Sequence, residues 1–358
     1  MNIEAKNYDL NFIQIVIRKE FRKNEQRTPL TPLDCNILIK RKNITIYVER
    51  SNNRCFNDTM YRDNGCILID SIHDKSNDLS QVLIIGLKEL DITNDIIFSY
   101  QHMYFSHTFK NQLGFDIILN KFRSNGGSIY DMEYFTDSNN KRLIAFGFYA
   151  GIAGAFLGLL QYKTKMITGS NIINCKPFNS LEEMLQKFIT YNITIHPTIA
   201  IIGNGRCAKG CIKLLEILNL KYTVYTREMS KTNLINSTII LNCIQSNEMI
   251  PPFITHDTLK NFTKLKVIVD ISCDYNNINN PLPIYNECST FENPIIKIND
   301  TVDLISIDNL PSLLPRESSK EFSKNLLELF LNDIYKENWI KVLSLYNMRQ
   351  NSIKDLST

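Results

Sequence analysis

The sequence predicts an α/β protein with two Rossmann-like domains, each a mostly parallel sheet flanked by helices, and an active site in the cleft between them. Three observations support this prediction. The chain has 358 residues, enough for two domains that each bury a hydrophobic core. Apolar strand-like runs alternate with helix-like segments along its first half. A glycine turn between a strand pattern and a helix pattern lies in the middle of the chain.

The first half of the chain reads as repeated strand and helix units. A helix is expected to run to about residue 42, with Thr31 as its N-cap residue and Pro32 at its first position. Further helices are expected at residues 60–64 and 111–125. Short apolar runs predict strands at residues 12–17, 44–49, 82–86, 105–107 and 128–131. This alternation is typical of a parallel sheet with helices on both faces.

Residues 143–160 are a stretch of eighteen uncharged residues between basic flanks. Their number alone makes the stretch a marginal candidate for a membrane-spanning helix. Four glycines within it would leave a flat surface for close packing, and no second apolar span accompanies it. We therefore favour a buried helix that crosses between the two domains.

The apolar run at residues 199–202 leads directly into the pattern Gly203-x-Gly205-x-x-Ala208. Gly203 would allow a tight turn, Gly205 would let the backbone approach a pyrophosphate, and Ala208 would let the helix at residues 207–218 pack closely. The pattern predicts a dinucleotide site, and the alternative is a tight turn in an unrelated α/β domain. The other strands of this domain are expected at residues 222–225, 238–242, 267–270 and 304–306.

The last part of the chain has helical periodicity at residues 320–345. This helix would pack back on the first domain, so that the chain crosses between the domains twice. The predicted substrate and catalytic domain is therefore discontinuous, with residues 1–145 and 318–358. Residues 146–317 form the predicted dinucleotide-binding domain.

Composition narrows the classes of function. The net charge of +3 is dispersed and no basic block with interleaved aromatic residues occurs, so nucleic acid is not an expected partner. The nine cysteines include no C-x-x-C pair, which favours a reducing compartment over a zinc site or a disulfide scaffold. The first residues contain no apolar signal segment. We expect a cytoplasmic protein without a metal or a membrane anchor.

Charged residues follow the predicted strands of the first domain. In open parallel sheets, ligands bind beyond the carboxyl ends of the strands. Arg18 follows the first strand, Lys88 and Glu89 follow a later one, and His107 and Glu133 follow two others. Each of them could instead be a solvated loop residue. A lysine beside other cations could act as a base, and the arginines of residues 18–27 could bind carboxylates. A hydride-transfer enzyme for a polycarboxylate is the resulting hypothesis.

The sequence resembles the fungal saccharopine dehydrogenases that form L-lysine and, more distantly, alanine dehydrogenase and the nucleotide half of transhydrogenase. The resemblance extends over nearly the whole chain. The motifs that carry it are IGLKEL at residues 85–90, FSH at 105–107, AFGFYAG at 145–151, NCI at 242–244, VDIS at 269–272 and SIDNLPSLLPRE at 306–317.

The resemblance implies roles for individual residues. Lys88 and His107 match the family's catalytic lysine and histidine, and crowded cations would lower the pKa of both. The implied substrate-binding residues are Arg22, Arg27, Lys88, Lys110, Gln112, Glu133, Arg142 and Phe146. The implied cofactor-binding residues are Lys141, Gly203, Gly205, Arg206, Tyr225, Thr226, Met229, Gln245, Ile271, Ile307, Asp308, Asn309 and Leu310. The family's substrates are saccharopine, lysine and 2-oxoglutarate, and a monomer is expected.

Three departures from the family pattern bear on the cofactor. Thr226-Arg227 stands where the family has an aspartate that would bind the ribose hydroxyls, and Tyr225 is its alternative counterpart. NAD remains the expected cofactor, although a hydroxyl beside an arginine could also accommodate NADP. Lys141 replaces a second arginine, and Gln245 replaces an aromatic residue near the adenosine. The family counterparts of Cys207 and Cys243 can pair, so a disulfide between them is a further expectation.

Two other functions remain open from the sequence. One is another amino-acid dehydrogenase of the same architecture, such as an alanine dehydrogenase, although the arginines of residues 18–27 and Arg142 disfavour a monocarboxylate substrate. The other is a non-catalytic nucleotide-binding protein derived from the enzyme. The presence of both Lys88 and His107 argues against it.

Overall fold

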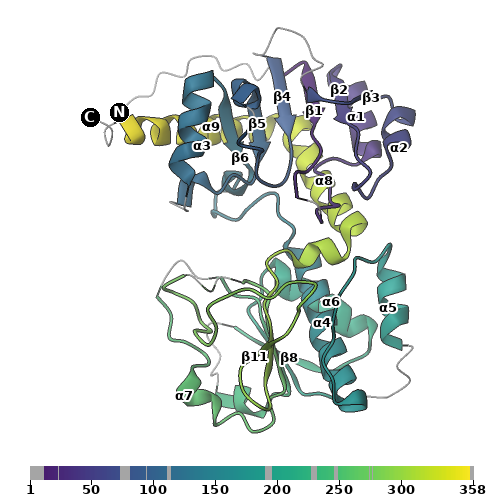
Figure 1. Cartoon of the computed structure of the whole chain (residues 1–358), viewed down its shortest axis with the longest axis vertical. Helices are drawn as coiled ribbons and strands as arrows, with labels where there is room; N and C mark the ends of the chain where they lie inside the picture. Colours follow the sequence, from purple (N-terminus) through teal and green to yellow (C-terminus); the bar gives the residue numbers. More distant parts are fainter. Residues whose placement is uncertain are drawn as a thin grey trace. The chain divides into compact units, whose positions relative to one another are not determined.

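The computed structural model describes residues 12–22, 24–72, 81–93, 95–110, 114–189, 196–226, 232–245, 249–273, 275 and 277–354. The chain divides into two compact units (Figure 1). Unit 1 consists of Met1–Ala145 and Ser318–Thr358, and unit 2 consists of Phe146–Glu317. The chain thus passes from one unit to the other twice, so that both ends of the sequence belong to the same unit.

The sheet of unit 1 has six strands in the order β3-β2-β1-β4-β5-β6, and every pair of neighbours is parallel. This is the order of a doubly wound dinucleotide-type sheet. Its strands are β1 (Gln14–Ile17), β2 (Thr45–Glu49), β3 (Ile67–Ile69), β4 (Val82–Ile85), β5 (Gln101–Tyr104) and β6 (Ser128–Asp131). Since all strands run the same way, their carboxyl ends share one edge of the sheet.

The helices of unit 1 come from both parts of the chain. They are α1 (Pro32–Lys42), α2 (Asp58–Asp63), α3 (Phe115–Asn125), α9 (Lys336–Lys354) and α8 (Pro315–Leu331), of which the first three residues belong to unit 2. The predicted start of α1 is confirmed, because the Thr31 hydroxyl accepts a hydrogen bond from the Asp34 amide at 3.3 Å and Pro32 occupies the first turn. Asn43 ends this helix in the left-handed conformation with φ 51°. Near the other end of the chain, α9 packs against β6 and α3 (Figure 1).

Two sequence predictions in unit 1 were wrong in position. The strand expected at residues 105–107 is β5, at Gln101–Tyr104. Because β5 contains polar residues, the sequence did not predict a strand there. His102 is nevertheless fully buried: burial lowers the pKa of His102 to about 3, and its Nε2 lies 2.7 Å from the Ile97 carbonyl. The helix expected at residues 320–345 is two helices, α8 and α9, because Asn332 adopts an extended conformation and caps the turn that follows.

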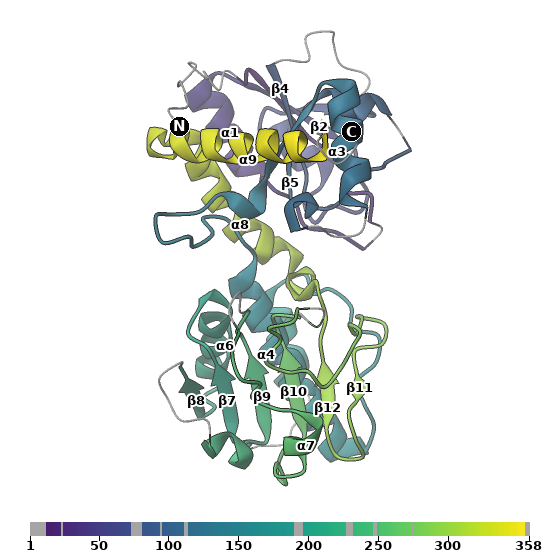
Figure 2. The same cartoon turned by 90° about the vertical axis from the view of Figure 1, so that its left-hand side faces the viewer.

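The sheet of unit 2 has the order β11-β12-β10-β9-β7-β8 (Figure 2), with only the β11–β12 pair antiparallel. The strands are β7 (Ile199–Ile202), β8 (Tyr222–Tyr225), β9 (Ile239–Asn242), β10 (Val267–Asp270), β11 (Ile296–Lys297) and β12 (Asp303–Ile305). Alternate residues of β7 face opposite cores: Ile199 and Ile201 belong to one apolar cluster, Ala200 and Ile202 to the other. Burial on both faces explains the uninterrupted apolar run of β7.

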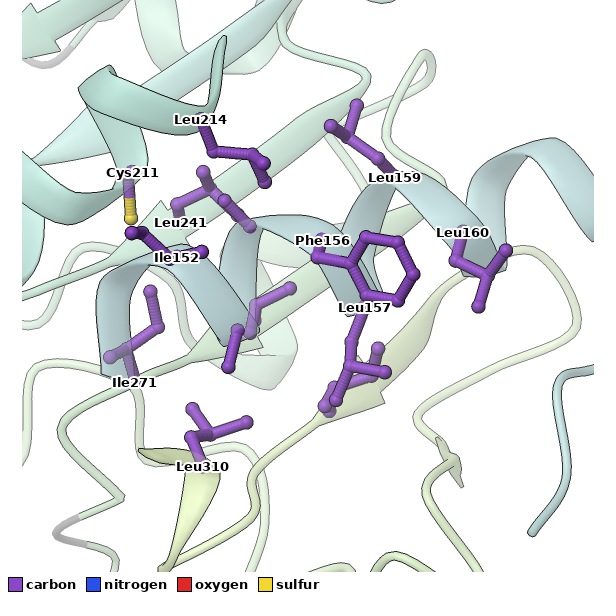
Figure 3. Packing of buried hydrophobic residues seen from close by; sticks show 14 of the residues in the cluster. Ile152, Phe156, Leu157, Leu159, Leu160, Cys211, Leu214, Leu241, Ile271 and Leu310 are labelled. Carbon is purple, nitrogen blue, oxygen red and sulfur yellow. The ribbon is translucent and has the colours of Figure 1, made fainter. Parts of the chain in front are cut away.

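Most of the uncharged stretch lies in the buried helix α4 (Gly147–Thr168), which belongs wholly to unit 2. The expected crossing between the domains by this helix was wrong, because the chain changes unit before the helix begins. Figure 3 shows Ile152, Phe156 and Leu157 of this helix packed together with buried residues of the neighbouring elements. The helix lies against β9, β10 and β12 of its own unit. Among the described residues, no helix is long and apolar enough to span a membrane. The bulk of α4 is therefore part of the hydrophobic core of unit 2.

The other helices of unit 2 are α5 (Leu181–Ile189), α6 (Arg206–Ile217) and α7 (His256–Leu259). Helices α4 and α6 approach unusually closely, at glycines. A Cβ on Gly151 would overlap the carbonyl of Cys207, and one on Gly210 would overlap the carbonyl of Phe148. A Cβ on Gly158, by contrast, would lie 2.7 Å from the Cγ2 of Val269, a side-chain atom. The close crossing of α4 and α6 therefore depends on the absence of a Cβ atom at Gly151 and Gly210.

This geometry predicts a difference between two glycine substitutions in the same helix. Gly151→Ala should destabilise the protein by about 2 kcal/mol, because backbone atoms must separate. Gly158→Ala should have a smaller effect, because a valine side chain can move. Urea unfolding followed by circular dichroism measures both. Equal midpoints for Gly151→Ala and the parent protein would contradict the close approach of the helices.

Candidate functional site

Four neighbouring strands of unit 1 present charged residues at their carboxyl ends. Arg18 follows β1 directly, and Lys88, His107 and Glu133 lie two or three residues beyond the ends of β4, β5 and β6. The pairing of β4 and β5 continues past their ends, since the Phe105 amide donates to the Leu87 carbonyl at 3.3 Å. The segments that carry Lys88 and His107 therefore run side by side.

Lys88 is half-buried, and its charge acts on the carboxylates of Glu25 and Glu89. Burial alone would raise the pKa of Glu25, but the charge and hydrogen bonds of Arg27, with the charge of Lys88, hold it below its usual value. Burial would likewise raise the pKa of Glu89, yet the hydrogen bond from Arg22 and nearby charges, including Lys88, lower it. Acidic side chains that are paired with arginines therefore interact electrostatically with Lys88.

His107 has an unusual backbone and an acidic neighbour. Its φ of 55° lies in the left-handed region, which residues other than glycine seldom adopt. Its Nδ1 lies 3.8 Å from Oε2 of Glu133, whose Oε1 lies 3.4 Å from Nη1 of Arg142. One carboxylate thus links the predicted catalytic histidine to a predicted substrate-binding arginine. A carboxylate beside an imidazole orients the ring for proton transfer.

A buried polar network supports the His107 turn. The Ser106 hydroxyl donates to Oδ2 of Asp131 at 2.7 Å and lies 2.8 Å from the Thr108 hydroxyl. Oδ1 of the fully buried Asp131 accepts from the Glu133 amide at 2.9 Å. These bonds join the turn after β5 to the turn after β6. Neither Ser106 nor Asp131 was predicted as a site residue. The available signal was that a polar residue stands on each side of His107, which was itself predicted from its place at a strand end.

The predicted substrate-binding arginines differ in exposure. Arg22 and Arg142 expose 48% and 42% of their side chains, whereas Arg27 exposes only 4%. Arg27 donates to Glu25 through Nε at 2.8 Å and through Nη2 at 2.6 Å. A substrate carboxylate at Arg27 would have to compete with this pair. Gln112 lies outside the described residues, and the side chain of Lys110 is not described.

Unit 2 contains a cavity of about 590 Å³ beside the glycine turn. This volume is within the range of small-molecule and cofactor sites. Backbone, apolar and amide groups line it: Gly203, Asn204, Gly205, Thr226, Cys243, Ile244, Gln245, Ile250, Pro251, Pro252 and Phe253. The structure thus brings together around one cavity four of the predicted cofactor-binding residues: Gly203, Gly205, Thr226 and Gln245.

The geometry of the glycine turn suits a phosphate group. Gly203 has φ 108°, which requires glycine, and its amide donates to the Tyr225 carbonyl at 2.9 Å. Gly205 caps the N-terminus of α6, and a Cβ on it would meet no atom within 4 Å. Open space beside a helix N-terminus, where backbone amides point outward from Arg206 onward, is a favourable place for an anion. These residues could hold the pyrophosphate of a dinucleotide.

Tyr225 and Thr226, the two residues that could stand in place of the family's ribose-binding aspartate, differ in burial. Tyr225 is 6% exposed and belongs to the core, whereas Thr226 is half-buried and lines the cavity. Thr226 directly follows the last residue of β8, and successive residues of an extended segment point to opposite faces. The side chain of Tyr225 therefore lies in the core and does not line the cavity. Arg227 and Met229 lie outside the described residues.

The remaining predicted cofactor residues, and the predicted substrate-binding residue Phe146, differ in burial. The side chains of Ile271, Ile307 and Leu310 are buried in the core, as Figure 3 shows for Ile271 and Leu310, so that only their backbone could contact a cofactor. Asp308 is exposed and Asn309 half-buried, after β12. Lys141 is exposed in a turn where its amide donates to Asp137 at 2.9 Å, and Phe146 directly precedes α4.

The expected cysteine pair is not formed. The sulfur in contact with Cys243 is that of Cys211, one turn beyond Cys207 along α6, at 3.7 Å, and both thiols are free. A closer pair was not predicted: the sulfurs of Cys273 and Cys288 lie 3.0 Å apart. The hydrogen bond between them lowers the pKa of the Cys288 thiol and raises that of Cys273. Among the described residues, no cluster suited to a metal ion occurs.

Comparisons with known proteins agree with this architecture. The family described as alanine dehydrogenase/PNT, N-terminal domain, matches residues 16–153, and its C-terminal domain matches residues 178–352. A protein of Yarrowia lipolytica named saccharopine dehydrogenase [NAD(+), L-lysine-forming] is 33% identical over 89% of this chain and 92% of its own length. A protein of the same name from Candida glabrata is 34% identical over 94% of this chain and 96% of its own.

Solved structures show the same fold at low sequence identity. An L-alanine dehydrogenase superimposes with a TM-score of 0.65 at 12% identity, covering 92% of this chain and 93% of its own. A transhydrogenase from Sinorhizobium meliloti gives a TM-score of 0.64 at 12% identity, covering 90% of this chain and 94% of its own. The predicted α/β fold, with two mostly parallel sheets flanked by helices, is thereby confirmed.

The sulfur distances predict which cysteines cross-link. Diamide should join Cys273 to Cys288, each thiol losing one hydrogen while the reagent accepts two protons and two electrons. Cys207 and Cys243 should remain unlinked, because the sulfur beside Cys243 is that of Cys211. Peptide mass mapping identifies the linked pair, and Cys288→Ser should abolish the cross-link. A Cys207–Cys243 link in the parent protein would contradict the geometry.

Proposed function

The chain belongs to the saccharopine dehydrogenase [NAD(+), L-lysine-forming] family, and from this premise we propose that it oxidises saccharopine to L-lysine and 2-oxoglutarate with NAD as hydride acceptor. The observation that carries the proposal is similarity at 33% identity over 89% of the chain to a relative of that name. In lysine biosynthesis by the aminoadipate pathway this reaction is the last step. We assign substrate binding and catalysis to unit 1 and dinucleotide binding to unit 2.

The residues of the chain can perform the proton transfers of this reaction. Saccharopine is a secondary amine that joins lysine to a glutarate skeleton. When bound, NAD would supply the acceptor for the hydride of the glutarate Cα. The amine must first lose its proton, and Lys88 is the proposed base. Water then adds to the resulting substrate imine, and His107, oriented by Glu133, moves the proton that releases lysine and 2-oxoglutarate.

Substrate and cofactor would be held by the groups described above. Arg142, with Arg22 and Arg27, would bind substrate carboxylates, since guanidinium groups form paired hydrogen bonds with them. Gly203 and Gly205 would bring backbone close to the pyrophosphate, at the N-terminus of α6. An alanine dehydrogenase-like activity is not favoured, because the curated relatives of similar length carry the saccharopine dehydrogenase name.

We also propose that the enzyme is a cytoplasmic monomer. Free thiols such as Cys35, Cys66 and Cys211 suit a reducing compartment. Analytical ultracentrifugation tests the oligomeric state, and a sedimenting species of twice the chain mass would contradict it.

The activity can be tested in the direction of saccharopine formation. The purified protein should oxidise NADH when L-lysine and 2-oxoglutarate are both present, and mass spectrometry should detect saccharopine. Pyruvate with ammonia, the substrates of an alanine dehydrogenase, should give no comparable rate. Turnover with pyruvate and ammonia but not with lysine and 2-oxoglutarate would indicate an alanine dehydrogenase instead. No turnover with either pair of substrates would favour a nucleotide-binding protein.

Lys88→Met should lower kcat by about 10² to 10⁴-fold while the Kd of NADH stays near that of the parent, because the change removes a proton-transfer group. His107→Gln should lower kcat similarly or somewhat less. The double variant should lose less than the sum of the two free-energy effects, since both groups serve one proton network. Steady-state kinetics of the four proteins measures this. Strictly additive losses would contradict the shared role.

Cofactor choice should depend on Thr226, which lines the cavity where an aspartate would repel the 2′-phosphate of NADP. The parent enzyme should use NADH with weak discrimination against NADPH. Thr226→Asp should penalise NADPH by on the order of 1 kcal/mol, about fivefold in kcat/KM. Thr226→Asn, which matches aspartate in size without its charge, is the control and should not. Equal NADPH kinetics for the two variants would show that a negative charge in place of Thr226 does not discriminate against NADPH.

A further inference from the structure

The peptide groups at Lys88 are held from two sides by charged side chains of another loop. Oε1 of Glu20 accepts a hydrogen bond from the Leu87 amide at 2.7 Å, and its Oε2 accepts one from the Lys88 amide at 3.0 Å. Nη2 of Arg18 donates a hydrogen bond to the Lys88 carbonyl. Both peptide groups that flank the Cα of Lys88 are therefore fixed by side chains that follow β1.

Arg18 and Glu20 form a buried ion pair of their own. Nη1 of Arg18 lies 3.2 Å from Oε2 of Glu20, and their side chains are only 4% and 5% exposed. The Arg18 guanidinium also lies 6.0 Å from the centre of the Tyr104 ring, on the strand that leads to His107. The pair thus lies within the strand-end region that carries both predicted catalytic residues.

A second layer of charges anchors this pair. Nη2 of Arg54 donates to the Arg18 carbonyl at 3.4 Å and to the Glu49 carbonyl at 3.0 Å. The Glu49 carboxylate accepts from the Lys19 amide at 2.9 Å and from the Ile72 amide at 2.7 Å. Both side chains belong to nearly fully buried residues. The loop that holds Lys88 is therefore itself held at its backbone.

Stability alone does not account for these charges. Burying an ion pair costs desolvation free energy, and well-packed apolar residues of similar volume are often equally or more stable. What charged groups add is direction, because each hydrogen bond fixes one backbone atom. The chain also leaves room for the pair at Gly86, where a Cβ would overlap the Arg18 guanidinium. Space, charge and hydrogen bonds thus converge on the Lys88 segment.

We propose that Arg18 and Glu20 are positioning residues for Lys88, holding its backbone so that its amine reaches the nitrogen of the substrate. This inference rests on the proposed function in that it takes Lys88 as the base. Neither side chain need touch the substrate. Since a misplacement of about 1 Å can lower a rate about 10²-fold, loss of either anchor should act mainly on kcat.

The decisive experiment is a set of double-mutant cycles. Glu20→Gln and Arg18→Lys, which keep the shape or the charge of the side chain, should lower kcat about 10- to 100-fold with less than about threefold change in KM and in the Kd of NADH. In the Lys88→Met background the same substitutions should change kcat less than about twofold, because no base remains to be positioned. Gln350→Leu is the matched control.

Gln350 is buried in the same unit, and its Nε2 donates to the Leu119 carbonyl at 2.7 Å and to the Tyr346 hydroxyl at 2.8 Å. Gln350→Leu should lower the unfolding temperature but leave kcat unchanged. The proposal is overturned if Glu20→Gln and Arg18→Lys keep the parental kcat, or if they lower kcat as much without Lys88 as with it.

A second measurement does not depend on turnover. An amine-reactive acylating reagent at fixed pH, followed by peptide mass spectrometry, gives the labelling rate of Lys88. Gly86→Ala changes no charge but must displace Arg18, so it should change this rate at least about threefold, while Gln350→Leu should not. An unchanged rate overturns the positioning role even in a protein that does not act on saccharopine. If the parent protein does not act on saccharopine but Gly86→Ala still changes the labelling rate of Lys88, the result would contradict the proposed function and not the positioning role.

Discussion

The parallel register of β1, β4, β5 and β6 is the constraint on which the catalytic unit depends. Ile17 pairs with Ile85, Ile85 with Met103, and Tyr104 with Asp131, so these strands end at nearly the same level. Residues more than a hundred positions apart in sequence, from Arg18 to Glu133, consequently gather at one edge. In a parallel sheet a shift by one residue would turn every side chain to the other face. The buried apolar strands exclude such a shift and so fix the chemistry at their ends.

The charges at this edge are arranged in pairs. Arg18 contacts Glu20, Arg27 contacts Glu25, and Glu133 lies near both His107 and Arg142. The buried pairs keep side chains in place without a ligand, because an unpaired buried charge would be strongly destabilising. The exposed contact of Arg142 is weaker and more easily exchanged for a substrate carboxylate. A substrate carboxylate could therefore replace Glu133 at Arg142 more easily than it could replace Glu25 at Arg27.

Local signals in the sequence predicted the parts of the structure that depend on neighbouring residues. Thr31 and Pro32 marked the start of α1, and the apolar run before Gly203 marked β7 and its turn. Local signals failed where tertiary contacts determine the structure. The polar His102 argued against a buried strand at β5, and Tyr225 can be assigned to the core only once the face of β8 on which it lies is known. The role of Glu20 could not be found from sequence spacing, since the Leu87 and Lys88 amides that it holds are 67 and 68 residues away.

Deuterium transfer from NADH that carries deuterium at both hydrogens of nicotinamide C4, in the presence of L-lysine and 2-oxoglutarate, is the most direct test of the proposed hydride transfer. We expect saccharopine with a single deuterium at the glutarate Cα, formed by the parent protein and greatly reduced in Lys88→Met. Saccharopine without deuterium, or deuterium transferred to another acceptor such as pyruvate in its place, would contradict it.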